Sequence, residues 1–248
     1  MQLTSPNARR TPVQNLPVGL VNPSDTTVGT ASAIAQYNLG NLTADSFEIA
    51  VIIGGNYTRN QSADDTIVGV AKPGLANSMI GVGKLNNTAS PASNGYLGNA
   101  PATGGNYYTS VAAGVQYNKS LTNPHGKVNI LVKTYNKRDG TVDTLVHTYS
   151  IISNSISGLT EAKDPTTGGM IVSFGAKANV TEITNPALPV AVDTGAILQL
   201  VFSPSGTTSP QAGSIAVQKP SGGLWFSSAW DGTKTAQKPL VSGMVTVQ

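Results

Sequence analysis

Histidine is the side chain best suited to proton transfer near neutral pH, and the sequence contains two, His125 and His147. His125 lies in the turn-like segment Pro124-His125-Gly126, whereas His147 lies in an apolar, strand-like stretch. A Ser-His-Asp site would need one of these histidines, but serine is too common in this chain for nearness in sequence to carry weight. The Gly-x-Ser-x-Gly pattern of a nucleophile elbow does not occur. We therefore expect both histidines to be structural, and we expect neither a catalytic residue nor an enzyme.

The carboxylates could in principle serve hydrolysis or metal binding. Glycoside hydrolysis needs two carboxylates in one cleft, and Glu48 is a single carboxylate on a predicted strand. Calcium accepts loop oxygens, and Asp64-Asp65 beside Asn60 is the one adjacent acidic pair, with a solvated turn as the alternative interpretation. Neither a phosphate loop nor a zinc-ligand spacing is present. We expect no metal and no cofactor.

The aromatic side chains offer one further site. Trp225, Phe226 and Trp230 lie close together in the sequence. If Leu224 begins an alternating strand, Trp225 faces away from Leu224 and Phe226, so the aromatics cannot all belong to one core. An exposed Trp225 or Trp230 would be a possible glycan contact; alternatively, Trp225 anchors the core and Trp230 packs under the following turn.

Charge is scarce in this chain of 248 residues. Only 11% of the residues are charged, compared with about 25% in ordinary soluble domains, and the net charge is +3. The basic residues form no stripe with interleaved aromatics, so we expect no direct nucleic-acid partner. No segment approaches the roughly 20 apolar residues of a membrane span, and the N-terminal residues do not resemble a secretory signal. The absence of Cys excludes disulfides and thiolate sites.

Hydrophobic periodicity predicts an all-β fold. Short runs of β-forming residues are separated by Gly, Pro, Asn and Ser, and almost no stretch keeps a helical period. The predicted strands lie near residues 30–37, 47–53, 66–70, 79–85, 107–117, 127–135, 144–152, 170–174, 196–202, 214–218, 224–228 and 244–247.

Two hairpins are predicted in the second half of the chain. In the strand 127–135, Val128, Ile130 and Val132 share one face with Thr134, which indicates that this face is buried. Asp139-Gly140 supplies a tight turn from this strand to the strand 144–152. A second hairpin is expected around the turn 219–223.

A break at residues 121–126 divides the predicted strands into two sets. Each set has the length of one small jelly roll or β-sandwich, which predicts two jelly rolls in tandem. The expected domains are an extended N-terminal arm at 1–25, a first β-sandwich at 26–122 and a second at 127–248. The arm is rich in Pro and could contact a neighbouring subunit.

In size and pattern the chain is similar to the small double jelly-roll capsid proteins of membrane-containing bacteriophages, because it combines a Pro-rich arm with two β halves and long loops. The resemblance implies a virion structural protein that forms homo-oligomers, with trimers in an icosahedral shell, and contacts other virion proteins. The alternatives are a phage tail or fibre component and an extracellular or cell-surface carbohydrate-binding or adhesive module. As a virion structural protein, the chain is expected to be located in the capsid.

Overall fold

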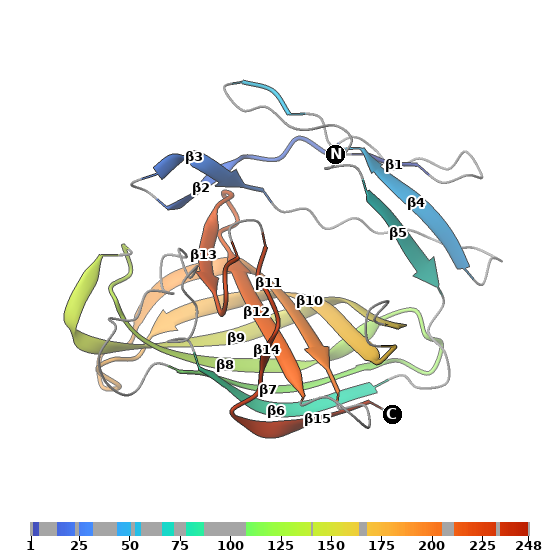
Figure 1. The fold of residues 1–248 in the computed structure, drawn as a ribbon. Coiled ribbons are helices and arrows are strands. Elements are labelled where there is room, and N and C mark those ends of the chain that lie inside the picture. Colours follow the sequence, from blue (N-terminus) through green and yellow to red (C-terminus); the bar gives the residue numbers. More distant parts are fainter. Residues whose placement is uncertain are drawn as a thin grey trace.

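The chain folds as an all-β protein (Figure 1). The computed structural model describes residues 2–4, 14–22, 25–31, 44–50, 53–55, 66–71, 78–86, 108–139, 141–163, 168–204, 211–231 and 234–247. These residues form fifteen strands and no helix, so the predicted fold class is confirmed at this level. None of the described segments is a helix long and apolar enough to cross a membrane.

The strands are β1 (Gln2–Thr4), β2 (Gly19–Asn22), β3 (Asp25–Thr30), β4 (Ala44–Ala50), β5 (Thr66–Ala71), β6 (Ser78–Asn86), β7 (Tyr108–Tyr117), β8 (Pro124–Asn136), β9 (Val142–Lys163), β10 (Met170–Glu182), β11 (Val190–Ser203), β12 (Ala212–Gln218), β13 (Leu224–Ser227), β14 (Lys238–Pro239) and β15 (Ser242–Val247). The strand predicted at 30–37 lies mostly outside the described residues.

Ten strands form one large antiparallel sheet. Its order is β13-β12-β11-β10-β9-β8-β7-β6-β15, and β14 pairs with β12 beside this path. Strands β6 to β13 therefore follow one another in space as they do in sequence, which is the order of a meander. The Greek-key connections of a jelly roll join strands that are not neighbours, and this sheet does not contain them. The predicted boundary at 122–127 falls at the turn between β7 and β8, which pair with each other.

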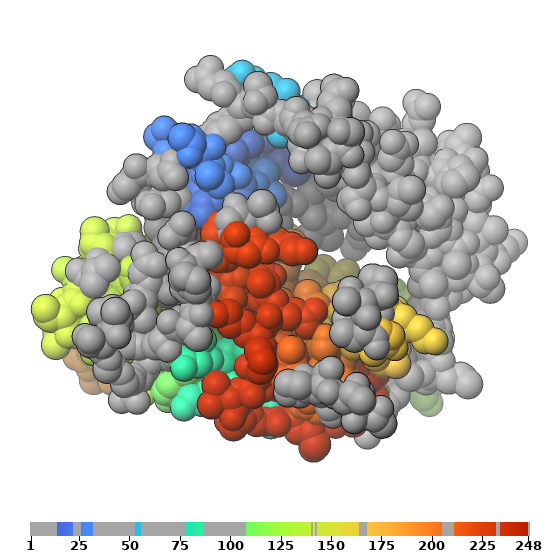
Figure 2. Space-filling view, viewed as in Figure 1, coloured from blue at the N-terminus to red at the C-terminus, as the bar shows by residue number. Residues whose placement is uncertain are grey.

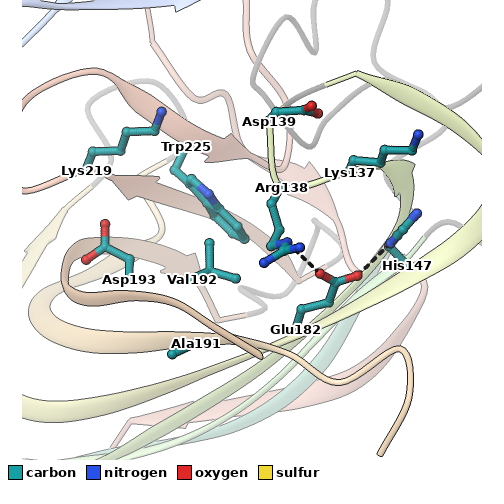
Figure 3. A pocket seen from close by; sticks show the side chains of 10 residues that line it. All are labelled: Lys137, Arg138, Asp139, His147, Glu182, Ala191, Val192, Asp193, Lys219 and Trp225. Atoms are coloured by element: carbon teal, nitrogen blue, oxygen red, sulfur yellow. Dashed lines mark hydrogen bonds and ion pairs between the residues drawn. The ribbon is translucent and has the colours of Figure 1, made fainter. Parts of the chain in front are cut away.

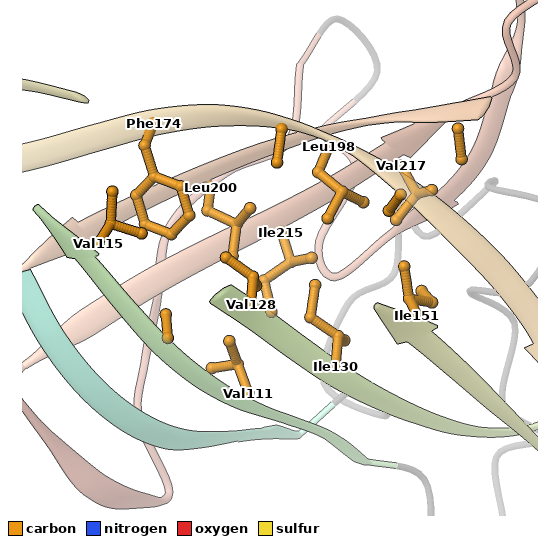
Figure 4. Packing of buried hydrophobic residues seen from close by; sticks show 14 of the residues in the cluster. Val111, Val115, Val128, Ile130, Ile151, Phe174, Leu198, Leu200, Ile215 and Val217 are labelled. Carbon is orange, nitrogen blue, oxygen red and sulfur yellow. The ribbon is translucent and has the colours of Figure 1, made fainter. Parts of the chain in front are cut away.

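The sheet curls so that one face encloses the core. Figure 4 shows Val128 and Ile130 of β8 facing Leu198 and Leu200 of β11 across this interior. The predicted inward face of β8 is confirmed, because Val128, Ile130, Val132 and Thr134 are all buried. Strands β6, β7 and β8 thus place alternate side chains in the core, which is the pattern that burial on one face requires.

Irregularities in pairing allow the long central strands to bend. The β9–β10 ladder shifts register between Gly175 and Ala176 and again between Lys177 and Ala178. Such shifts leave an unpaired residue on one strand and increase the local bend and twist. They occur midway along β10, so the long strands β9 and β10 can take part in both sides of the curled sheet (Figure 1).

Both predicted hairpins are present. Strand β8 pairs with β9, and the amide of Lys137 donates to the carbonyl of Thr141 over 2.8 Å. Strand β12 pairs with β13, and the amide of Lys219 donates to the carbonyl of Gly223 over 2.9 Å. In this second turn Gly222 and Gly223 have φ angles of 88° and 94°, a region that glycine enters without steric cost.

The N-terminal strands pair outside the large sheet. Strand β2 pairs with β3, and β1 and β5 flank β4. Val21 of β2 is buried against Leu224 and Trp230, so this part of the predicted arm packs on its own chain. In Figure 2 the blue N-terminal residues lie beside the red C-terminal ones. Strands β1 and β2 lie within the segment 1–25 that was expected to be an extended arm.

Candidate functional site

A cluster of ionisable side chains lies at one mouth of the curled sheet (Figure 3). Asp143 and His147 are four residues apart on β9, so the alternation of the strand places them on the same face. Glu182 ends β10, and Arg138 lies in the turn between β8 and β9. We call Asp143, His147, Glu182 and Arg138 the His147 cluster.

Both ring nitrogens of His147 face carboxylates. His147 Nδ1 lies 2.7 Å from Glu182 Oε1, and His147 Nε2 lies 3.0 Å from Asp143 Oδ2. Ionised carboxylates only accept hydrogen bonds, so both contacts are satisfied when each ring nitrogen carries a proton. This arrangement therefore favours the imidazolium form of His147.

Two further groups bind the same carboxylates. Arg138 Nε lies 3.0 Å from Glu182 Oε2, and Thr184 Oγ1 donates to Glu182 Oε1 over 3.0 Å. Lys137 Nζ lies 3.7 Å from Asp143 Oδ2. The cluster thus ties the β8–β9 turn to the end of β10.

The charges in the cluster shift one another's pKa values. The hydrogen bond from His147 is the largest cause that lowers the pKa of Asp143, to about 2. Burial by itself lowers the pKa of His147, but its hydrogen bonds to Glu182 and Asp143 outweigh this effect and raise the pKa above 6.5. Burial would raise the pKa of Glu182, yet hydrogen bonds from His147 and Thr184 lower it overall.

Aromatic rings connect this cluster to the core. The rings of His147 and Tyr149 are stacked with centroids 6.3 Å apart, and Tyr149 meets Trp225 edge to face at 5.4 Å. The Tyr149 hydroxyl donates to the carbonyl of Asn136 over 3.0 Å. Burial is the main cause that raises the pKa of Tyr149, so this phenol stays protonated.

His147, Glu182 and Arg138 of the cluster form one wall of an open pocket of about 660 Å³. Lys219 and Asp193 lie on the opposite side, and Val192 and Trp225 lie between the two walls (Figure 3). Burial lowers the pKa of Lys219, and the nearby charge of Asp193 opposes this effect.

The geometry restricts the chemistry of His147. A general base needs a nitrogen lone pair directed at the proton it removes, and both nitrogens of His147 are already committed to carboxylates. A cluster with opposite charges on three elements instead holds those elements together. Within the described ranges, no group of three or more His, Cys, Asp or Glu side chains is arranged to hold a metal ion.

The sequence singled out His147 but missed its partners. Glu182 is 35 residues away, and no local pattern connects it to His147. Asp143 lies one residue before the strand predicted at 144–152, and only the earlier start of β9 at Val142 places it on the same face as His147. His125 lies elsewhere, where its Nε2 accepts a hydrogen bond of 3.0 Å from the Gln116 amide on the surface.

The other predicted site residues are not brought together. Trp225 and Trp230 are only 2% and 7% exposed, and Trp225 lies in the core, as in the alternative that made it a core anchor and not a glycan contact. Both are covered because β13 and the residues after it fold back onto β12. Glu48 lies in β4, and the segment with Asn60, Asp64 and Asp65 lies outside the described residues.

A second feature lies on the outer surface of the curled sheet. Ile80 and Val82 of β6 and Met244 of β15 are 60%, 56% and 62% exposed. Met244 is directly opposite Val82, which in turn is opposite Ala112 of β7. We call these four residues, with Gly114 opposite Ile80, the outer apolar face.

The outer apolar face is uncharged over several strands. Beyond Ala112, the same cross-strand row continues through Asn129 to Ile152, which is 41% exposed. Lys84 and Lys127 border the face, and Lys84 Nζ lies 3.9 Å from the centre of the Tyr108 ring. Exposed apolar patches of this kind mark interaction sites when they are larger than scattered single residues.

Comparison with protein-family models, curated proteins and solved structures found no match to this chain.

Proposed function

We propose that this chain is a virion structural protein, a bacteriophage capsid subunit that works by associating with copies of itself. The observation that carries the proposal is the outer apolar face, because Ile80, Val82 and Met244 expose large hydrophobic side chains without a charge among them. Burying such side chains between proteins is favourable in water.

A second copy of the chain is the partner that best fits this surface. An uncharged face does not repel its own copy, whereas a charged one would. The three strands that carry the face lie about 4.8 Å apart and are roughly 20–30 Å long, which gives a footprint of roughly 300–400 Å². That is about half of the roughly 800 Å² that each partner contributes to a standard interface, so the contact would extend along the row toward Ile152.

Face-to-face packing suits this end of the sheet better than addition of a strand. The Gln211 amide donates to the carbonyl of Val245 and accepts from its N–H, with distances of 3.2 and 2.7 Å. A side chain therefore occupies the hydrogen-bonding groups at the middle of edge strand β15. Occupied edges resist pairing with another strand, so the exposed face is the surface left for contact.

The virion part of the proposal rests on the sequence. The low charge content reduces repulsion between many identical copies, and the chain has no catalytic or cofactor motif. The double jelly-roll arrangement, trimers within an icosahedral shell and contacts to other virion proteins belong to the same proposal. The strand order of the described sheet does not itself supply the jelly-roll connections.

The proposal predicts that charge on the outer apolar face prevents assembly. In Ile80→Lys/Val82→Lys, positive charges would meet across the interface, so the native mass should fall to that of a monomer. Leu188→Lys is the matched control, because Leu188 is also exposed, at 70%, but lies in the loop between β10 and β11. Light scattering gives the mass, and circular dichroism checks that both variants stay folded.

Two outcomes of this experiment would contradict the proposal. If both variants and the unaltered protein form the same oligomers, the outer apolar face is not the interface. If the unaltered protein is itself a monomer, the alternative of an extracellular carbohydrate-binding or adhesive module takes the place of the capsid reading.

A further inference from the structure

Arg138 offers unused hydrogen-bond donors to the open pocket of about 660 Å³ beside the His147 cluster. A guanidinium group carries five N–H donors. Among the described residues its one ion-pair partner is Glu182, whose Oε2 lies 3.0 Å from Arg138 Nε. A single carboxylate engages two of the five donors at most, so at least three remain for another acceptor. The Arg138 side chain is 52% exposed, so a ligand can reach it.

Glu182 fixes the position of this guanidinium. The Glu182 side chain is only 13% exposed, and its Oε1 is bonded to His147 Nδ1 and to Thr184 Oγ1. In Figure 3 the guanidinium lies between Glu182 and Val192, so the edge that Glu182 does not occupy faces across the pocket. An arginine that is already held in place loses little side-chain freedom on binding, which favours a ligand at that edge.

Positive charge exceeds negative charge in the wall that carries Arg138. The two carboxylates of this wall, Glu182 and Asp143, are faced by three basic groups, which are Arg138, Lys137 and protonated His147. Three positive charges against two negative ones leave one positive charge over. A ligand group with a single negative charge would balance it.

The other acidic side chains at the pocket are directed elsewhere. Asp139 Oδ1 accepts hydrogen bonds from the amide and the hydroxyl of Thr141, over 2.9 and 2.7 Å, and in Figure 3 its carboxylate points away from Arg138. Asp139 is also exposed, so water screens its charge. On the opposite wall Asp193 is offset by Lys219.

Apolar surface that a ligand can touch lies next to the guanidinium. Ala191 is exposed and Val192 is half-buried, and both line the pocket. A volume of about 660 Å³ is within the range of roughly 300–1,000 Å³ that is usual for small-molecule sites. A ligand with an anionic head and a small apolar body would match both kinds of surface.

The shape of the donor group favours a carboxylate as that head. Two parallel N–H bonds of a guanidinium fit the two oxygens of a planar carboxylate. We propose that this pocket binds a small ligand whose carboxylate accepts two hydrogen bonds from the outer edge of Arg138 and whose apolar body lies on Val192. A phosphate fits the same fork, but its second negative charge exceeds the one positive charge that the wall leaves over. The site is independent of self-association.

Three probes that share an aromatic ring and differ in the head group test this proposal. They are benzoate, phenyl phosphate and benzyl alcohol. Saturation-transfer difference NMR observes the probe, so it works whether the protein is a monomer or an oligomer. Each probe is titrated at pH 6 and constant ionic strength up to about 50 mM, which covers millimolar dissociation constants. Benzoate should bind saturably, phenyl phosphate more weakly, and benzyl alcohol about tenfold more weakly because it has no charge to pair with Arg138.

Substitution of Arg138 locates the bound probe. Arg138→Gln removes both the charge and the fork, so it should weaken benzoate binding at least about tenfold. Arg138→Lys keeps the charge without the fork, and it should also weaken binding. Lys119→Gln is the matched control, because it makes the same change in net charge in the exposed turn between β7 and β8, and it should bind benzoate like the unaltered protein. Circular dichroism checks that each variant is folded.

Three results would overturn the proposal. The first is the absence of saturable benzoate binding to the unaltered protein. The second is binding of benzyl alcohol or phenyl phosphate at least as tight as that of benzoate, which would mean that the carboxylate is not what the pocket recognises. The third is benzoate binding that persists unchanged in Arg138→Gln, which would place the probe elsewhere. The first two results need no variant, so the test holds even if Arg138→Gln does not fold.

Discussion

His147 lies between two carboxylates, and this position makes the stability of the fold depend on pH in two directions. The pKa of His147 is raised in the folded state, so its contribution is full below its ordinary value of 6.5 and is lost as the pH rises through the folded pKa. The pKa values of Asp143 and Glu182 are lowered, so their contributions are full above about 4.5 and are lost as the pH falls.

These opposite signs predict a window in which the His147 cluster is most stabilising. Between about pH 4.5 and 6.5 the carboxylates are ionised and the imidazole is protonated, so all contacts of the cluster are made. The difference in the free energy of unfolding between the unaltered protein and His147→Gln should be largest in this window. Urea denaturation at a series of pH values measures it, and a difference that does not vary with pH would contradict the assignment.

Ser153 is expected to contribute to stability through a buried hydrogen bond that involves no charge. Its Oγ accepts a hydrogen bond of 2.8 Å from the amide of Val128, and both residues are buried. Ser153→Ala leaves this N–H without a partner, which should cost about 1–3 kcal/mol in the free energy of unfolding. The exposed Ser155 is the control, and Ser155→Ala should change stability by less than about 0.5 kcal/mol in the same denaturation experiment. Equal effects would show that the Val128 bond is unimportant.

Single residues of the candidate site were only partly predictable. His147 could be recognised by its type, but Glu182 reaches it through the β9–β10 pairing, which places residues far apart in sequence side by side. The burial of Trp225 and Trp230 depends on the chain returning over β12. Local alternation could show that the aromatics face different ways, but it could not show that both faces of this strand region are covered.

At the scale of the elements, the sequence predicted strands well where apolar and polar residues alternate clearly. Where a strand is mostly polar, the predicted strand was shorter than the observed one. The strand predicted at 127–135 is recovered in β8, because its apolar residues alternate. Strand β9 was predicted to end at 152 but continues to Lys163 through a stretch rich in Ser, Gly and charged residues. That stretch is held by pairing with β10, a tertiary effect that local propensity does not contain.

We expect the stability of the protein to depend on the backbone conformation of Gly126, near the start of β8. Its φ of 143° is unfavourable for other residues, and a Cβ at this position would lie within 2.0 Å of the Gly114 carbonyl oxygen. Gly126→Ala should therefore lower the free energy of unfolding by roughly 1–3 kcal/mol. Thermal denaturation of this variant provides the measurement.

Gly114→Ala is a matched control for this substitution. Gly114 lies opposite Lys127, next to Gly126, but a Cβ there would meet nothing within 4 Å. The control should stay close to the stability of the unaltered protein. A Gly126→Ala protein as stable as the control would mean that this turn adapts without cost.

At the scale of the whole molecule, the sequence predicted the class of fold but not the order of strands. The strand count and turn residues are shared by jelly rolls and meanders, so they indicate an all-β protein without choosing between them. What separates the two is which strands pair. Here β15 pairs with β6 and not with its sequence neighbour β14, a choice made by long-range contacts.

Assembly is also a property of the whole molecule, because the outer apolar face combines β6 and β7 with β15, which lies beside β6 in the large sheet but far from it in the sequence. The face exists only when the chain has folded and β15 has joined β6. The side chains that we propose to meet a second copy are therefore invisible as a group in the sequence, although each is an ordinary strand residue there.

The most direct test of self-association is the native mass of the unaltered protein. Light scattering should be measured up to about 100 µM, far above a micromolar dissociation constant, with negative-stain imaging of the same peak. We predict a homo-oligomer, with closed shells at high concentration. A monomer at every concentration would contradict the proposal that this chain is an assembly subunit.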